Sequence, residues 1–188
     1  MMTQKINLHV MKSTVKSFMV MSMLKGSFLL AAFMLPVDAQ AQIHEVDQTI
    51  YGMDCAPCAY AVENRMKNKD GARNVTLSLN EGKTVAEFAP GSRVTLEDIR
   101  DAIRRGGFDA RDATLRLTGS LNREGGMWIL SLPSGEKFQL DRYEDMIPES
   151  DLEERSGQEI TLTGHVPKGY EPHEQGWLIH IMELPISN

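Results

Sequence analysis

Two cysteines lie where an extended pattern changes into a helical one, and this junction constrains the fold more than any other feature. They belong to the segment Gly52-Met53-Asp54-Cys55-Ala56-Pro57-Cys58. A strand-like run containing Val46 and Ile50 precedes the segment, and a helical pattern follows from about Ala56 to Lys69. Two thiolates at this spacing can reach one ion, and soft sulfur ligands favour Cu(I) or Hg(II) over Mg²⁺ or Ca²⁺. The pair therefore indicates a site for a soft heavy-metal ion.

Residues 43–113 alternate between strand and helix signals, in an order typical of a small α+β domain. After the first helix, two alternating runs flank the turn Asn80-Glu81-Gly82 and predict a hairpin. Thr95 is a good N-cap for a second helix, whose apolar stripe consists of Leu96, Ile99, Ala102 and Ile103. Gly106-Gly107 ends that helix, and residues 108–113 complete the order βαββαβ. We therefore expect a ferredoxin-like domain over residues 43–113.

After about residue 114 the pattern changes to short runs separated by turn residues. Strands are expected at residues 115–121, 127–132, 137–140, 159–166 and 176–184, with one short helix near Ser150–Arg155. Trp128 and Trp177 are expected to fill the core. The pattern predicts a small antiparallel all-β domain of OB type over residues 114–188. A simple meander of strands would show the same pattern, so that alternative stays open.

The first 41 residues have the features of a secretory signal peptide. Lys5, Lys12 and Lys16 give a positive start, an apolar stretch follows, and Ala39-Gln40-Ala41 offers a small-x-small cleavage site. The uninterrupted apolar part, residues 26–35, is too short to span a bilayer as a helix. We expect cleavage of the leader, export to the periplasm and no integral membrane span afterwards. An uncleaved leader that acts as a membrane anchor is the alternative.

The charge of the remaining chain excludes one class of partner. Residues 42–188 hold 16 basic and 25 acidic side chains, because four Lys and only Asp38 precede them. A net charge of −9 repels phosphate backbones, so we expect no nucleic-acid partner.

The cysteine segment resembles a known family, the heavy-metal-associated domain, through Gly52-Met53-x-Cys55-x-x-Cys58 after a strand and Gly106-Gly107-Phe108 after the second helix. The family includes copper chaperones, the N-terminal modules of copper-pumping ATPases and a periplasmic mercury-binding protein. The resemblance implies that Cys55 and Cys58 bind one ion, Cu(I) or Hg(II), per domain. It also implies that Met53 packs beneath the loop and that Phe108 lies near it.

The resemblance further implies a carrier that passes its ion by thiolate exchange to a membrane metal transporter or another metal-accepting protein. Export is shared with the mercury-binding member, whereas most copper chaperones of the family work in the cytosol. Asp54 departs from the pattern, because a small neutral polar residue is commoner there. Residues 114–188 lie outside the resemblance.

Other interpretations of the same residues stay open. The Cys-x-x-Cys pair also fits a periplasmic thiol-disulfide oxidoreductase, or an adaptor in which the pair is a structural disulfide. His165 and His180 can face each other on the last two strands and bind a second metal. The acidic run from Glu144 to Glu154 is a solvated face or a docking patch. Nothing in residues 114–188 offers a nucleophile–base pair. We expect no catalytic residue and a binding protein rather than an enzyme.

Overall fold

The computed structural model describes residues 42–142 and 147–184, which all fall within one compact unit of the chain. The predicted signal peptide, residues 1–41, lies outside the described residues, as do residues 143–146 within and beside the acidic run. Within the described ranges, no helix is long and apolar enough to cross a membrane.

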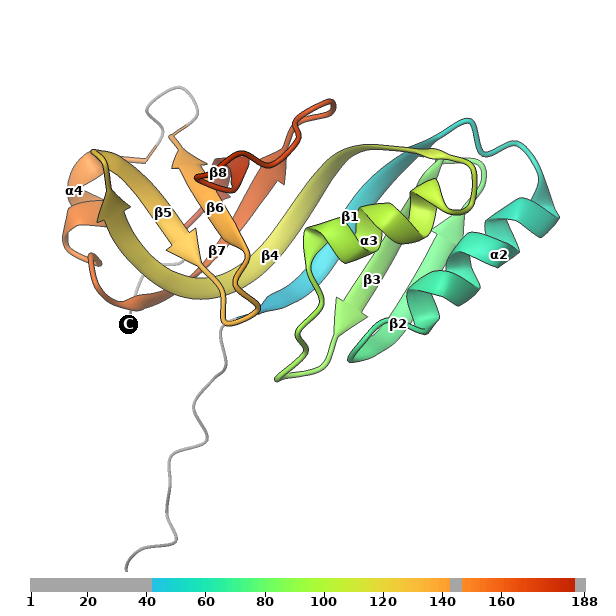
Figure 1. The fold of residues 1–188 in the computed structure, drawn as a ribbon, viewed down its shortest axis with the longest axis horizontal. Coiled ribbons are helices and arrows are strands. Elements are labelled where there is room, and N and C mark those ends of the chain that lie inside the picture. The colour runs from blue at the N-terminus through green and yellow to red at the C-terminus, as the bar shows by residue number, and fades with distance from the viewer. Residues whose placement is uncertain (1–41, 143–146, 185–188) are drawn as a thin grey trace, which may run out of the picture. The chain divides into compact units, whose positions relative to one another are not determined.

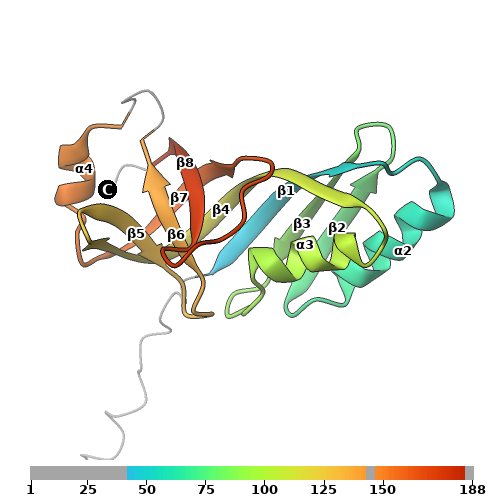
Figure 2. The ribbon, with the colours of Figure 1, turned by 45° about the horizontal axis from the view of Figure 1, so that its top comes forward.

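The predicted βαββαβ order is confirmed, with boundaries close to those expected from the sequence (Figure 1). The elements are β1 (Ile43–Tyr51), α2 (Ala56–Lys67), β2 (Ala72–Ser78), β3 (Lys83–Phe88), α3 (Leu96–Arg104) and β4 (Asp109–Glu124). Their strands pair in the order β2-β3-β1-β4, all antiparallel. Both helices cover the same face of this sheet (Figures 1 and 2).

Between the helices and the sheet lies an apolar core formed from the stripes that the sequence predicts. Its members are almost fully buried and include Val46, Ile50, Val62, Met66, Leu96, Ile99 and Ile103. Burying side chains of this size stabilises a fold by about 1.5–3 kcal/mol each. The core therefore fixes the end of β1 against the start of α2, which is where the cysteines lie.

Helix α3 begins with a complete capping box. The Thr95 hydroxyl accepts a hydrogen bond from Asp98 N at 3.0 Å, and the Asp98 carboxylate accepts one from Thr95 N at 3.2 Å. Two backbone donors that lack helical partners are thereby satisfied.

Replacing this cap gives a first testable prediction. Thr95→Ala is expected to lower the free energy of unfolding by about 1 kcal/mol, measured by urea titration, because the hydroxyl that accepts from Asp98 N and donates to the Asp98 carboxylate is lost. Thr95→Ser keeps the hydroxyl and is the matched control, with an expected loss of only a few tenths of a kcal/mol. Equal losses in the two variants would show that the hydroxyl does not stabilise α3.

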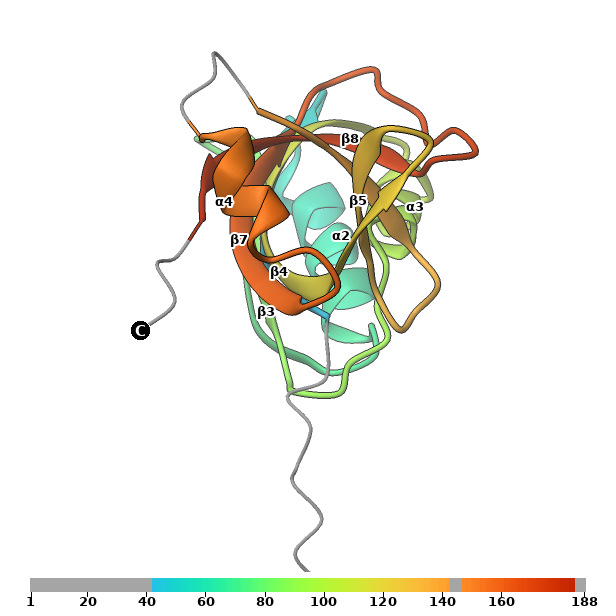
Figure 3. The same cartoon turned by 90° about the vertical axis from the view of Figure 1, so that its left-hand side faces the viewer.

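The C-terminal part is built from β4, β5 (Met127–Ser131), β6 (Lys137–Asp141), α4 (Glu149–Glu153), β7 (Glu159–Val166) and β8 (Trp177–Glu183). Its strands pair in a closed circuit, β4-β5-β6-β8-β7-β4, which we call the C-terminal circuit. Only the β6–β8 pairing is parallel among these. Figure 3 shows the strands around a common interior. Helix α4 is joined to the end of β4 by an ion pair between Arg123 and Glu149. Trp177 and Trp128 are 1% and 7% exposed, so their predicted burial is confirmed.

Strand β4 belongs to both parts of the molecule. It pairs with β1 from Asp109 to Leu117 and with β7 from Ala113 to Ser120, and its last residues pair with β5. The sequence predicts two strands here, separated near residue 114. They are one continuous strand, since no glycine or proline interrupts residues 109–118. The predicted division into residues 43–113 and 114–188 thus falls inside β4 and stays a prediction.

Buried polar contacts join α3 to the C-terminal circuit. Arg100 of α3 is 3% exposed, stacks on Trp177 at 4.6 Å from the ring centroid, and donates to the Tyr170 carbonyl at 3.0 Å. The carboxylate of Glu136, in the β5–β6 turn, accepts hydrogen bonds from Leu96 N at 3.0 Å and from Trp177 Nε1 at 2.7 Å. These contacts hold α3 against the circuit.

Candidate metal centre at the start of α2

The segment between β1 and α2 is an exposed loop anchored by one buried side chain. Gly52 has a φ of 85°, a left-handed conformation that glycine adopts without steric cost, and it follows the last residue of β1. Met53 is 7% exposed and packs in the apolar core. With Met53 buried beneath the loop, the residues after it are held at the surface.

The two cysteines are held together by the first turn of α2. Cys55 is the N-cap residue, with φ −128° and ψ 132°, and its Sγ accepts a hydrogen bond from Cys58 N at 3.2 Å. The Cys55 carbonyl accepts the first helical bond, from Ala59 N at 3.0 Å. The Cα atoms of the pair are 5.3 Å apart, and both residues are half-buried. Because the helix N-terminus carries a partial positive charge, it favours negative charge on both sulfurs.

The structure joins Cys55 and Cys58 in a disulfide, so it represents the oxidised form of the site. A disulfide has no thiolate to offer a metal ion. Reduction by an external thiol adds two electrons and two protons and yields two thiols, one at the N-cap and one in the first turn of α2.

Phe108 lies on the side of the domain that faces α2. It is partly buried and packs against the core. A Cβ added to Gly106 would come 2.7 Å from Val62 Cγ2 and 3.2 Å from Phe108 Cδ2, so Gly106 allows the two to lie close together. Val62 lies one helical turn beyond Cys58 on α2. The structure therefore brings Phe108 to the helix that carries Cys58.

A charged and aromatic group at the base of the loop was not predicted. Tyr51, the last residue of β1, is 65% exposed and lies opposite Asp109. The Arg111 guanidinium stacks over the Tyr51 ring at 4.5 Å and pairs with Asp109 at 2.9 Å. Tyr60, on α2, is also 65% exposed. The sequence places Tyr51 directly before Gly52. It does not show that β1 pairs with β4, and this pairing is what brings Asp109 and Arg111 to Tyr51.

The cysteine pair has no partner ligands nearby among the described residues. Within residues 42–142 and 147–184, no group of three or more His, Cys, Asp or Glu side chains is arranged to hold one ion. The reduced pair would thus be a two-coordinate sulfur site, which leaves the ion accessible to a further thiolate.

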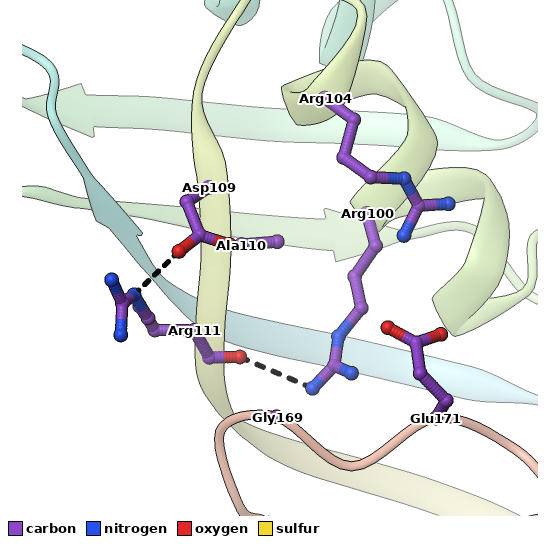
Figure 4. A pocket seen from close by; sticks show the side chains of 7 residues that line it. All are labelled: Arg100, Arg104, Asp109, Ala110, Arg111, Gly169 and Glu171. Carbon is purple, nitrogen blue, oxygen red and sulfur yellow. Dashed lines mark hydrogen bonds and ion pairs between the residues drawn. The ribbon is translucent and has the colours of Figure 1, made fainter.

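A polar pocket of about 120 Å³ lies between α3, the start of β4 and the segment after β7 (Figure 4). It is lined by Arg100, Arg104, Asp109, Ala110, Arg111, Gly169 and Glu171, and it contains none of the predicted site residues. Arg111 pairs with Asp109 across one wall, and Arg104 pairs with Glu97 outside it. Burial lowers the pKa of Arg100, whose guanidinium also donates to the Arg111 carbonyl at 3.1 Å. These pairs compensate most of the positive charge of the pocket.

Comparison with known proteins gives matches over the same part of the chain. The heavy-metal-associated domain model matches residues 49–109. The copper chaperone CopZ of Staphylococcus saprophyticus is 32% identical over 62 residues, which are 33% of this chain and 90% of that protein. The cation-transporting ATPase HMA5 of Oryza sativa is 36% identical over 66 residues, which are 35% of this chain but only 6% of the ATPase. The solved structure of a CopZ metallochaperone is 27% identical and covers 35% of this chain and 97% of its own, with a TM-score of 0.33.

Proposed function

The chain belongs to the heavy-metal-associated domain family, and from this premise we propose that it carries a soft metal ion on Cys55 and Cys58. The family's domain is a binding module and not an enzyme, so the alternative of a thiol-disulfide oxidoreductase is not retained. Each domain would hold one ion between its two sulfurs. Met53 and Phe108 would shape the loop without touching the ion.

One observation carries the proposal. The fold brings both sulfurs to the first turn of one helix, at the surface and at half exposure, with a buried methionine fixing the loop beneath them. A structural disulfide needs no such placement, and one that closes a loop of this length restrains the unfolded chain little. A carrier needs both sulfurs at the surface, because an acceptor protein must be able to reach the ion that they hold.

We propose Cu(I) as the cargo, with Hg(II) as the second candidate. Two relatives are a copper chaperone and a human copper-transporting ATPase, and sulfur ligands suit Cu(I). Mercury has the same preference for two thiolates, so the ligand set alone favours neither ion.

Transfer to an acceptor would proceed by ligand exchange. One thiolate of the acceptor binds the ion as a third ligand, one of the two cysteine thiolates leaves, and a second exchange completes the transfer. The ion keeps its charge throughout, and no electron moves. A membrane metal transporter is the proposed acceptor, because the chain is similar to small parts of two ATPases that transport cations or copper.

We also propose that the protein works in the periplasm after removal of residues 1–41. The charged start, the apolar stretch and the small-x-small site at Ala39-Gln40-Ala41 support this location. In that compartment the pair is exposed to oxidation, so a thiol reductant or loading with metal before oxidation would be required.

The OB-type assignment of residues 114–188 belongs to the same set of proposals. Its support is the closed five-strand circuit with a parallel β6–β8 pairing and a short helix between β6 and β7. Its contacts with α3 give it a role in holding the metal-binding part in place.

A titration of the reduced and oxidised chains tests the proposed function. Under anaerobic conditions, the reduced chain is expected to remove one Cu(I) per chain from a chromophoric chelator, whereas the disulfide form removes none. Repeating the titration with Hg(II) against a competing thiol ranks the two ions. Equal uptake of Cu(I) by both redox forms would contradict a site made of the two sulfurs.

A further inference from the structure

The polar pocket beside α3 contains a buried cation that has no carboxylate paired with it. Arg100 is 3% exposed, and its guanidinium contacts the carbonyls of Tyr170 and Arg111 and the ring of Trp177. Among the described residues, no carboxylate forms an ion pair with Arg100, and its Nε is buried without a hydrogen-bond partner. Burying a charge is costly unless an opposite charge or sufficient hydrogen bonds compensate it. The pocket therefore offers positive charge to a ligand.

A second guanidinium group reaches the pocket from the next turn of α3. Arg104 follows Arg100 by four residues, so both side chains extend from one face of the helix (Figure 4). Arg104 pairs with Glu97 outside the pocket, and the two side chains of this pair are 39% and 51% exposed. An exposed ion pair contributes at most about 1 kcal/mol. Arg104 can therefore exchange Glu97 for an anion that is better placed in the pocket.

Glu171 faces these arginines from the segment between β7 and β8. Figure 4 shows its carboxylate directed toward the Arg100 guanidinium. Burial lowers the pKa of Arg100, and the negative charge of Glu171 acts in the opposite direction. Glu171 is exposed and forms no ion pair with another described residue, so the space between its carboxylate and the guanidinium groups stays open. Its carboxylate marks a position that attracts negative charge.

The size and chemistry of the pocket fit a small oxyanion. A guanidinium group presents parallel N–H donors that match the oxygens of carboxylates and phosphates. A cavity of about 120 Å³ has room for several water molecules, or for one small oxyanion in their place. Arg111 is already held by Asp109 at 2.9 Å and by the ring of Tyr51 at 4.5 Å, so it forms a wall of the pocket without serving as a ligand.

We propose that the pocket binds a small oxyanion, a phosphate or a carboxylate, between Arg100 and Arg104, and that Glu171 competes with it for the same position. The site uses no sulfur, so it is independent of the function proposed for Cys55 and Cys58. Arg100 also contacts Trp177 and the Tyr170 carbonyl. A bound oxyanion would thus stabilise the contact between α3 and the C-terminal circuit.

The test titrates the full chain, metal-free and in its disulfide form, with sodium phosphate and separately with sodium acetate at constant ionic strength. Heteronuclear NMR is expected to show saturable shifts confined to amides near residues 100–111 and 169–171. Arg104→Gln is expected to weaken binding at least about tenfold, because a charged donor is lost. Glu171→Gln is expected to strengthen binding by up to about fivefold, because a repelling charge is lost. The tighter of the two probes identifies the preferred class of oxyanion.

Arg105→Gln is the matched control for the loss of one positive charge. The Arg105 side chain is 73% exposed, pairs with Asp101 and does not line the pocket, so binding is expected to stay unchanged. Arg100 is kept in every variant, because it also holds Trp177 and the Tyr170 carbonyl.

Thermal unfolding separates loss of the site from loss of the fold. Without ligand, the three variants are expected to unfold near the temperature of the parent. Phosphate is expected to raise that temperature for the parent and for Arg105→Gln, and not for Arg104→Gln, since a ligand that binds only the folded state stabilises it. Absence of saturable binding of both probes by the parent, an equal loss in Arg104→Gln and Arg105→Gln, or binding by Glu171→Gln that is no tighter than that of the parent would overturn the proposal.

Discussion

Replacing both cysteines, as Cys55→Ser/Cys58→Ser, is expected to lower the Cu(I) affinity of the reduced chain by at least about a thousandfold. Serine hydroxyls stay protonated and are hard oxygen ligands, so neither side chain replaces a thiolate. No cluster of three or more ligating side chains surrounds the loop among the described residues. The loss is measured by competition with a Cu(I) chelator.

The structure gives a reason why this loss would not come from a damaged helix. Cys55 is the N-cap of α2, and its Sγ accepts a hydrogen bond from Cys58 N. Serine is among the best N-cap residues and its hydroxyl can accept the same bond. Cys55→Ser alone is therefore expected to keep or raise the stability of α2 while it removes one of the two ligands.

Asp54→Asn is the matched control for charge beside the site. Asp54 is exposed next to Cys55, and its carboxylate is not proposed as a ligand. Its replacement is expected to change Cu(I) affinity by no more than a few-fold, through the lost negative charge. A loss as large as that of the double serine variant would show that the Asp54 carboxylate is itself a ligand.

Local signals in the sequence were sufficient to predict the helices and strands that form the site. The change from strand to helix at Gly52, the cap at Thr95 and the glycines at 106 and 107 each act within a few residues, and the structure has an element boundary at or near each of them. Cys55 and Cys58 are neighbours through the geometry of one helical turn alone. Such features depend on nearby residues, so one sequence is sufficient to reveal them.

Contacts between distant segments could not be predicted in this way. Strand β4 belongs to both parts of the molecule because it pairs with β1 on one side and with β7 on the other, partly over the same residues. The alternation of apolar residues in a sequence does not specify which strand is the partner. Trp177 was expected only to fill a core, yet it also stacks on Arg100 and donates to Glu136. The burial of Arg100 and the partial burial of Glu136 give no signal in a sequence, because both residue types are usually exposed.

Glu136 leads to the second large prediction, a dependence of stability on pH that one substitution removes. Its carboxylate is enclosed between the start of α3 and Trp177, and burial raises its pKa from 4.5 to about 7. Hydrogen bonds from Leu96 N and Trp177 Nε1 act in the opposite direction, since they favour the charged form. Asp98, which is nearby on α3, raises the pKa further by repulsion.

The direction in which stability changes with pH follows from the protons bound by the folded and unfolded protein. Between about pH 4.5 and pH 7 the folded protein keeps a proton on Glu136 that the unfolded chain releases. Stability from this group is therefore complete below pH 4.5 and is lost as the pH rises through 7. A pKa difference of this size between the folded and unfolded states changes the free energy of unfolding by at most about 3 kcal/mol.

Glu136→Gln keeps the shape and an acceptor oxygen but carries no charge at any pH. We expect the variant to be more stable than the parent by about 1–2 kcal/mol at pH 8, after allowing about 1 kcal/mol for weaker hydrogen bonds, and to match it at pH 5. Urea unfolding of both proteins at pH 5, 6, 7 and 8 measures the difference, which isolates Glu136 from every other titrating group. Glu159→Gln, at an exposed position on β7, is the control and should give a difference that does not vary with pH. If Glu136→Gln instead destabilises the protein equally at all four pH values, the carboxylate is charged throughout and its N–H donors outweigh its burial.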